Sequence, residues 1–183
     1  GRRRSLERTL RTFRALVTSK THQFRFLIHD DVLEGMTSES EDCRRFIREY
    51  GLFDKIFFAE TNRGIGESIK ILLQAVESDL YFHLEDDWTF LRPLDLDPIL
   101  GIFQDYRQVN YIRFYSETNS PDLHTLVKGL GEIRTRQYSF NGQVLMLAPF
   151  WSHQANLSRT DSPFSRLVLS LSGRFRERMC NEF

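Results

Sequence analysis

Two hydrophobic periodicities alternate along residues 5–84, and this alternation constrains the fold more than any other feature. Three segments repeat apolar side chains at helical spacing and predict amphipathic helices: 5–17, 38–50 and 69–76. Three short apolar and aromatic runs predict strands: 23–29, 55–59 and 80–84. Helices that alternate with strands over short connections indicate an α/β domain with a mainly parallel sheet and right-handed crossovers.

The second half continues less regularly. Its patterns predict, in chain order, a helix at 97–106, a strand at 111–115, a polar loop at 116–131 and a helix from Pro163 onward. Two more strand-like segments, 133–139 and 142–148, are separated by Asn141-Gly142. Because Asn-Gly is the pair that tight hairpin turns prefer, these two strands are expected to form a hairpin.

The composition of the chain narrows the range of functions that it can have. The chain has 183 residues, which fits a single domain, and its 25 basic residues balance 25 acidic ones. A neutral chain has no overall field to attract DNA or RNA, which argues against a nucleic-acid partner.

Two cysteines, Cys43 and Cys180, make no disulfide framework and favour the reducing cytoplasm. No apolar run is long enough for a transmembrane helix, and the sequon Asn156-Leu157-Ser158 is attributed to chance.

Acidic residues end two of the predicted strands. Asp30-Asp31 follows the first strand, and the triplet Glu85 to Asp87 follows the third. Ligands of open α/β sheets bind outside the carboxyl ends of the strands, so both groups are expected at one edge. Adjacent carboxylates raise one another's pKa unless a positive group offsets them, and a hard divalent cation does so. The triplet therefore predicts a cation site suited to a diphosphate ligand, and the alternative is a solvated acidic strand end.

An ordered set of motifs resembles GT-A-fold glycosyltransferases, closest to the inverting, family 2-like group. The set comprises the Asn62-Arg63-Gly64 loop, the helix with Ile-Leu-Leu-Gln-Ala at 71–75, and an apolar strand that ends in Glu-Asp-Asp-Trp. Ile-His-Asp-Asp at 28–31 is similar to that group's second strand, and the opening Gly-Arg-Arg-Arg-Ser-Leu-Glu-Arg-Thr-Leu to its first helix.

The resemblance implies a single domain over 1–183 that contains a Rossmann-like open sheet with helices on both faces. Residues 1–90 would form the nucleotide-sugar-binding half and residues 91–183 the acceptor-binding half. A chain of this class seldom opens with a helix, so the family's first strand is expected to be missing from this sequence.

The same resemblance assigns roles to the acidic triplet. Asp87 would ligate Mn²⁺ or Mg²⁺ directly. Asp86 would contact the ribose or the waters of the metal, and Glu85 would support both. The family more often carries Asp-x-Asp at this place, and Glu-Asp-Asp is a familiar variant.

The resemblance assigns the nucleotide contacts to the acids at the other strand end, Asp30-Asp31. Asp31 or Asp30 would contact uracil or another base, so a UDP-sugar is the favoured donor, with the acceptor unknown. Arg63 would lie near the nucleotide, or else is an exposed loop arginine.

The catalytic base of an inverting reaction would come from the acceptor half. The acids after the hairpin are Glu177, Glu182 and Asp161, with Glu177 ranked first. Asp161 precedes Ser-Pro and is equally explained as a helix cap.

The expected function is therefore a divalent-metal-dependent hexosyltransferase that moves a sugar from a nucleoside diphosphate to an acceptor hydroxyl. Two alternatives remain: a truncated or inactive GT-A-like nucleotide-binding module, and a nucleotidyltransferase.

Overall fold

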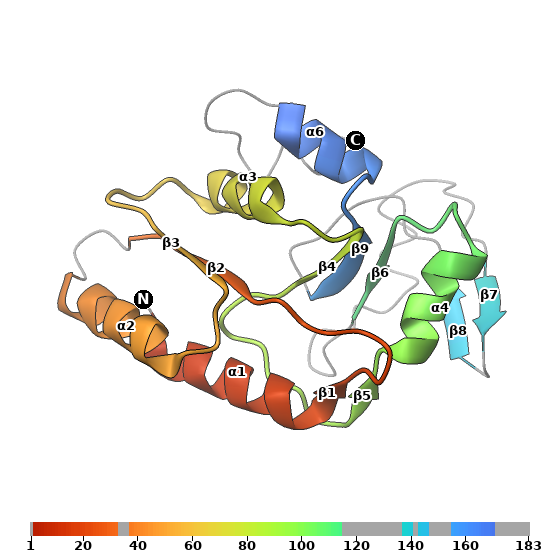
Figure 1. Cartoon of the computed structure of the whole chain (residues 1–183), viewed down its shortest axis with the longest axis horizontal. Coiled ribbons are helices and arrows are strands. Elements are labelled where there is room, and N and C mark those ends of the chain that lie inside the picture. The colour runs from red at the N-terminus through yellow and green to blue at the C-terminus, as the bar shows by residue number, and fades with distance from the viewer. Residues whose placement is uncertain (1, 33–36, 115–136, 141–142, 147–154, 171–183) are drawn as a thin grey trace, which may run out of the picture.

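The computed structural model describes residues 2–32, 37–114, 137–140, 143–146 and 155–170 (Figure 1). The described residues contain five helices: α1 (Arg3–Leu16), α2 (Thr37–Tyr50), α3 (Ile65–Ala75), α4 (Asp97–Asp105) and α6 (Pro163–Ser170). Each predicted helix is present, because amphipathic spacing reports directly on the face that a helix buries. Every described helix is too short or too polar to cross a membrane.

The strands are short. Those predicted from the apolar runs are β2 (Leu27–Asp30), β3 (Lys55–Phe58), β4 (Leu80–His83), β6 (Tyr111–Arg113), β7 (Gln137–Phe140) and β8 (Gln143–Met146). Three more were not predicted: β1 (Val17–Thr18), β5 (Leu94–Asp95) and β9 (Asn156–Arg159). The β7 and β8 strands pair antiparallel as the predicted hairpin, while the turn residues 141–142 and the predicted loop 116–131 lie outside the described residues.

The mixed α/β class agrees with the prediction, but the described strands form four small sheets rather than one open sheet. β2 pairs in parallel with β3, and β1 with β5. β4 pairs antiparallel with β9, which in turn pairs antiparallel with β6. The expectation of a mainly parallel sheet fails for this last group because β9 reverses direction between its two neighbours.

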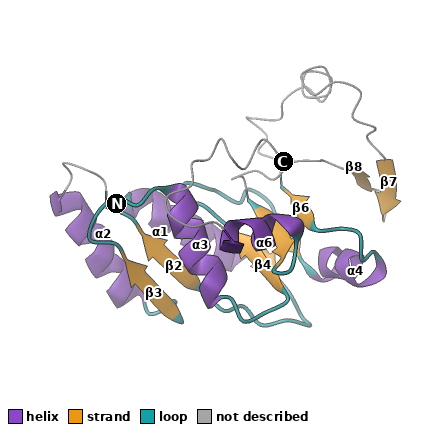
Figure 2. Ribbon diagram, turned by 90° about the horizontal axis from the view of Figure 1, so that it is seen from above, coloured by secondary structure: helices purple, strands orange, loops and turns teal. Residues whose placement is uncertain are grey.

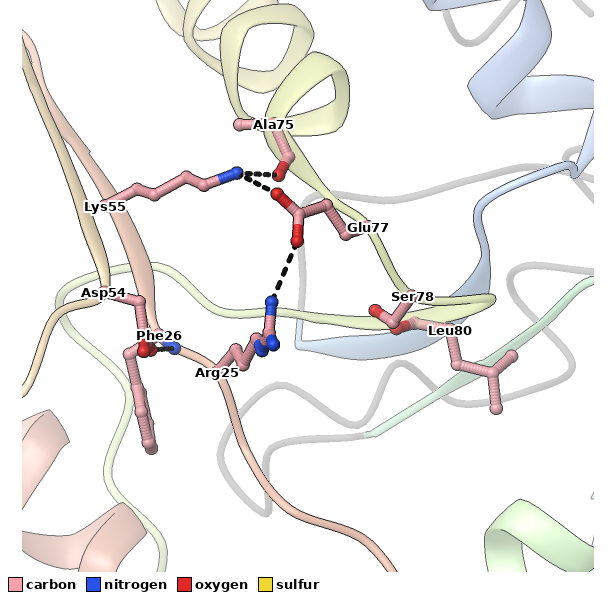
Figure 3. A network of polar contacts seen from close by, with 8 residues as sticks. All are labelled: Arg25, Phe26, Asp54, Lys55, Ala75, Glu77, Ser78 and Leu80. Atoms are coloured by element: carbon pink, nitrogen blue, oxygen red, sulfur yellow. Dashed lines mark hydrogen bonds and ion pairs between the residues drawn. The ribbon is translucent and has the colours of Figure 1, made fainter.

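Ion pairs show that β4 nevertheless runs in the same direction as β2 and β3. Glu77, just before β4, accepts hydrogen bonds from Lys55 at the start of β3 and from Arg25, which precedes β2 (Figure 3). The amino ends of the three strands therefore meet. β3, β2 and then β4 lie across the molecule in that order in both views (Figures 1 and 2).

Helices cover both faces of these strands. On one face α1 and α2 bury Leu6, Leu10, Cys43 and Ile47 against β2 and β3. On the other face α3 and α6 bury Ile69, Leu73 and Val168 against Tyr81 of β4. A third cluster, between the end of α1, α4 and the antiparallel sheet, centres on Phe13, Leu96, Leu100, Phe103 and Leu157. Neighbouring residues of β4 thus serve different clusters, as strand alternation requires.

The unpredicted strand β9 occupies the middle of the three-stranded sheet. Its Asn156 and Ser158 are buried, and the Ser158 hydroxyl donates to Asn156 Oδ1 at 2.6 Å. Both residues belong to the sequon, whose asparagine has no exposed surface, so the folded protein offers no glycosylation site there.

Candidate functional site

The acidic triplet leaves the end of β4 and lies against α1. The hydroxyl of Thr9, which is almost completely buried, lies 2.8 Å from the carbonyl oxygen of Asp86 and 2.6 Å from that of Trp88. One helical turn later, Thr12 Oγ1 accepts a hydrogen bond from the backbone N–H of Phe90. Two hydroxyls on one face of α1 thus hold the turn that carries the triplet.

Arg2 lies directly over two of these acids. Its guanidinium donates to Asp86 Oδ1 through Nη2 and to Asp87 Oδ2 through Nη1, the second at 3.2 Å. An arginine at the N-terminus of a helix faces the positive end of the helix dipole, which is unfavourable unless an acid lies beside it. The first turn of α1 contains no acid, so Asp86 and Asp87 supply the compensation from β4.

The electrostatics of Asp86 reflect opposed effects. Burial raises its pKa above the usual range, the charge of Arg2 lowers it, and the neighbouring Asp87 raises it again. Asp87 is the more exposed of the two, with 47% of its side chain accessible against 30% for Asp86. A cation that approaches from solvent therefore meets Asp87 first.

Asp30, at the end of β2, is bound to α2. Its Oδ2 accepts from Arg44 Nε at 2.9 Å, and the same guanidinium also reaches the carbonyl oxygen of Ala59. Only 9% of Asp30 is exposed. Its charge is thus already balanced inside the protein.

Asp31 stabilises the loop before α3 by accepting hydrogen bonds from its backbone. Its Oδ1 accepts the backbone N–H of Arg63 at 2.9 Å and its Oδ2 that of Gly64 at 2.7 Å. Asn62 Oδ1 accepts a second bond from Gly64, whose φ of 80° is an angle that glycine adopts without strain. The Asn-Arg-Gly motif is therefore a turn held by Asp31, and it leaves the Arg63 side chain exposed.

Cys43 of α2 lies within the electrostatic range of one acid from each strand end. Both Asp30 and Asp86 act on Cys43 of α2: burial first, and then these negative charges, raise the pKa of its thiol to about 11. The thiol is thus protonated at neutral pH and unsuited to be a nucleophile. Burial likewise lowers the pKa of His29 on β2, against the nearby Asp31 and Asp30, so its ring is neutral at neutral pH.

Of the proposed catalytic bases only Asp161 lies within the described residues, and it is not at this edge. β4 begins opposite Arg159 and ends opposite Asn156, so Asp161, just after β9, lies at the amino end of β4 rather than beside the triplet. Asp161 is 74% exposed, and its carboxylate lies 3.9 Å from Arg166. Ser162, not Asp161, caps α6, because its hydroxyl accepts the backbone N–H of Ser165. Glu177 and Glu182 lie outside the described residues.

The donor set fits a divalent cation in part. Oxygens of Asp86 and Asp87 converge on one positive group, Arg2, which is the arrangement that a cation between them would need. The part of the chain that is described holds no group of three histidine, cysteine or acidic residues placed to bind a metal. A magnesium-type ion at this position would therefore complete its coordination with water and with phosphate oxygens of a ligand.

Two residues that contact the acidic turn were not singled out from the sequence, Arg2 and Thr9. Arg2 had a usable signal, because a run of arginines at the start of a helix requires acids from elsewhere in the fold. Thr9 had a weaker one, as a polar residue within the apolar stripe of α1. No family model matches this chain, and neither a curated protein nor a solved structure matches it significantly.

Proposed function

We propose that the chain is the GT-A-like domain of a glycosyltransferase that uses a nucleoside-diphosphate sugar and a divalent cation. The observation that carries the proposal is the convergence of Asp86 and Asp87 on one positive group, Arg2, at the carboxyl end of β4. Such an edge is where open α/β sheets bind nucleotides.

The proposed fold is a single Rossmann-like open sheet. β2 and β4 run the same way, yet each is an edge strand of its own small sheet among the described residues. One further parallel strand between β2 and β4 would join them into a continuous sheet. Its carboxyl end would lie near the start of α1, since Arg2 contacts the acids at the end of β4.

The residues would divide the work as follows. Mn²⁺ or Mg²⁺ between Asp87 and Asp86 would offset the charge of the departing diphosphate. Glu85 and Thr9 would hold the turn, while Asp31 would hold the loop that carries Arg63.

A carboxylate of the acceptor half would take the proton of the acceptor hydroxyl. Glu177 stays the first candidate and Glu182 the second. The position of Asp161 at the opposite end of β4 disfavours it.

The test is the substitution Asp87→Asn, measured by calorimetry with Mn²⁺ and UDP. We expect binding to be lost while the free energy of unfolding changes by less than about 0.5 kcal/mol, since the side chain is largely exposed. Asp79→Asn is the matched control, because this exposed acid directly precedes β4 at its other end. Unchanged Mn²⁺–UDP binding in Asp87→Asn would refute the proposal.

A second candidate is a nucleotide-binding module without catalysis. It is favoured by Arg2, whose guanidinium already pairs with Asp86 and Asp87, the acids that a catalytic cation would need. Hydrolysis of a panel of UDP-sugars with Mn²⁺ separates the two, because a module binds UDP but releases no sugar.

A further inference from the structure

The outer face of α1, which runs along one edge of the molecule, carries an excess of positive charge (Figure 1). The helix contains five arginines and a single acid, Glu7. Four of the arginines are exposed and lie three or four residues apart, so they share one face of the helix: Arg4, Arg8, Arg11 and Arg14. Among the described residues, none of these four guanidinium groups has an ion pair or a hydrogen bond. Glu7 offsets only part of their charge.

The acids around this face are paired with other arginines. Asp42 of α2 contacts Arg3 and Arg45, and the acids of the turn after β4 contact Arg2. The chain as a whole is neutral, so the face is a local concentration of positive charge. Such a face is complementary to an anionic surface, and guanidinium groups suit phosphate because they bind its oxygens through two parallel N–H groups.

An exposed apolar side chain lies beside the arginines. The backbone N–H of Phe90 donates to Thr12 Oγ1, one helical turn after Arg8, and this contact places the next residue, Leu91, beside α1. The ring of Phe90 packs edge-to-face on Phe13 and holds the segment there. Leu91 is 68% exposed, the largest fraction among the exposed large apolar side chains that the structure describes. Arginines next to an exposed leucine suit a bilayer surface, where the charges meet lipid phosphates and the leucine enters the acyl boundary.

From this geometry we propose that the outer face of α1, together with Leu91, docks the protein on a bilayer of anionic phospholipid. The inference goes beyond the proposed function, because none of these residues belongs to the proposed cation or nucleotide site. The association is peripheral: the arginines are drawn to the headgroups and Leu91 inserts beside them. A nucleic acid would also satisfy the arginines, but it offers no apolar layer to Leu91, so the membrane is the favoured partner.

The test measures co-sedimentation of the chain with vesicles of phosphatidylcholine and phosphatidylglycerol in equal parts, and with vesicles of phosphatidylcholine alone. We expect binding to the mixed vesicles only, and weaker binding as salt is added, because salt screens exposed charges. The double variant Arg8→Gln/Arg11→Gln should bind about 25-fold more weakly, which is about fivefold for each arginine near an anionic surface. Leu91→Ser should bind about tenfold more weakly, because it loses the burial of an apolar side chain.

The matched control is Arg107→Gln/Arg166→Gln, which removes the same charge away from α1. Arg107 is exposed after α4, and Arg166 is exposed on α6, which covers the opposite face of the strands. This control should bind the mixed vesicles as tightly as the unaltered chain. A loss equal to that of Arg8→Gln/Arg11→Gln would mean that net charge explains the binding and that the docking face is wrong.

Two further results would overturn the proposal. The first is equal binding of the unaltered chain to the two kinds of vesicle, or binding to neither. The second is unchanged binding of Leu91→Ser to the mixed vesicles, since the leucine would then not insert. Tight binding of that variant to a DNA duplex would in this case identify the face as a nucleic-acid surface.

Discussion

Asp31 shows how a single carboxylate can stabilise a loop. Its two oxygens accept backbone N–H groups from Val32, Arg63 and Gly64, at distances between 2.7 and 3.2 Å. Hydrogen bonds to a charged acceptor are stronger than neutral ones, and here three donors depend on it. The side chain therefore sets the conformation of the turn that leads into α3.

Replacing Asp31 by asparagine should loosen this turn. One of the two acceptor oxygens becomes an NH₂ group that faces backbone N–H donors, so we expect a loss of about 1–3 kcal/mol in the free energy of unfolding. Urea unfolding measures it, with the exposed Glu60→Gln as control. The resemblance assigns the contact with uracil to Asp31 or Asp30; if Asp31 makes it, the variant loses its preference for UDP over ADP in competition binding. Equal urea midpoints for Asp31→Asn and the unaltered chain would contradict the structural role.

At the scale of elements, α1 contributes to two of the three core clusters. Its first half packs Leu6 and Leu10 against α2, and Phe13 in its second half lies within the cluster below β4. The Phe13 ring contacts four other phenylalanines edge-to-face at 5.4–5.7 Å, namely Phe24, Phe26, Phe82 and Phe90. Phe24 and Phe26 precede β2, whereas Phe82 lies in β4 and Phe90 follows it, so these partners come from two separate small sheets and the segments beside them.

Removing the Phe13 ring tests whether α1 stabilises the molecule by contributing to two core clusters. Phe13 is only 5% exposed, so Phe13→Ala should cost about 3–5 kcal/mol in the free energy of unfolding. The matched control is Phe24→Ala, since Phe24 touches the same ring but is 37% exposed and should cost clearly less. Thermal and urea unfolding measure both. Similar losses for the two variants would mean that Phe13 is no more central than its neighbour.

At the scale of the whole molecule, the two ends of the parallel strands differ in kind. The amino ends are joined by the exposed Arg25–Glu77–Lys55 network, which positions strands but contributes little energy (Figure 3). The carboxyl ends gather acids, one of which has a pKa raised chiefly by burial, Asp86. Ion pairs thus link the amino ends of the strands, whereas the acids at the carboxyl ends are paired with arginines of α2 and of the residue before α1.

The acid sensitivity of the fold follows from carboxylates at other places. Hydrogen bonds from Ser19, the backbone of Lys20 and Thr21 lower the pKa of Asp97 to about 2, and Lys55 lowers that of Glu77. A carboxyl group whose pKa is lower in the folded state than in the unfolded state takes up its proton at a higher pH when the chain is unfolded. Its contribution to stability is therefore present above about pH 4 and is lost as the pH falls towards 2.

Asp97→Asn should remove the largest part of this dependence. We expect its denaturant midpoint to fall less steeply between about pH 4 and pH 2 than that of the unaltered chain. The control is Asp105→Asn, an exposed acid at the other end of α4, which should keep the original slope. Parallel curves for Asp97→Asn and the unaltered chain would show that the Ser19 contact does not hold this carboxylate.

The sequence alone determined the helices and most of the strands. Helical periodicity depends on residues three and four apart, so α1 and α3 could be located without knowledge of any partner. The positions of the acids at the ends of β2 and β4 followed in the same way, because a strand and the residues after it are adjacent in the chain. That these acids meet at one edge stays a prediction from the α/β pattern; the structure shows that Asp30 and Asp86 each raise the pKa of Cys43.

Only the tertiary structure decided which elements pair and which charges balance. β9 was missed because its Asn156 and Ser158 bury polar groups that bond each other, so no apolar pattern marks the central strand. Its register with β4 spans more than seventy residues, and local spacing carries no information about it. The partners of Arg2, Asp30 and Asp31 were equally out of reach, because an ion pair between distant segments depends on a contact that exists only after the chain has folded.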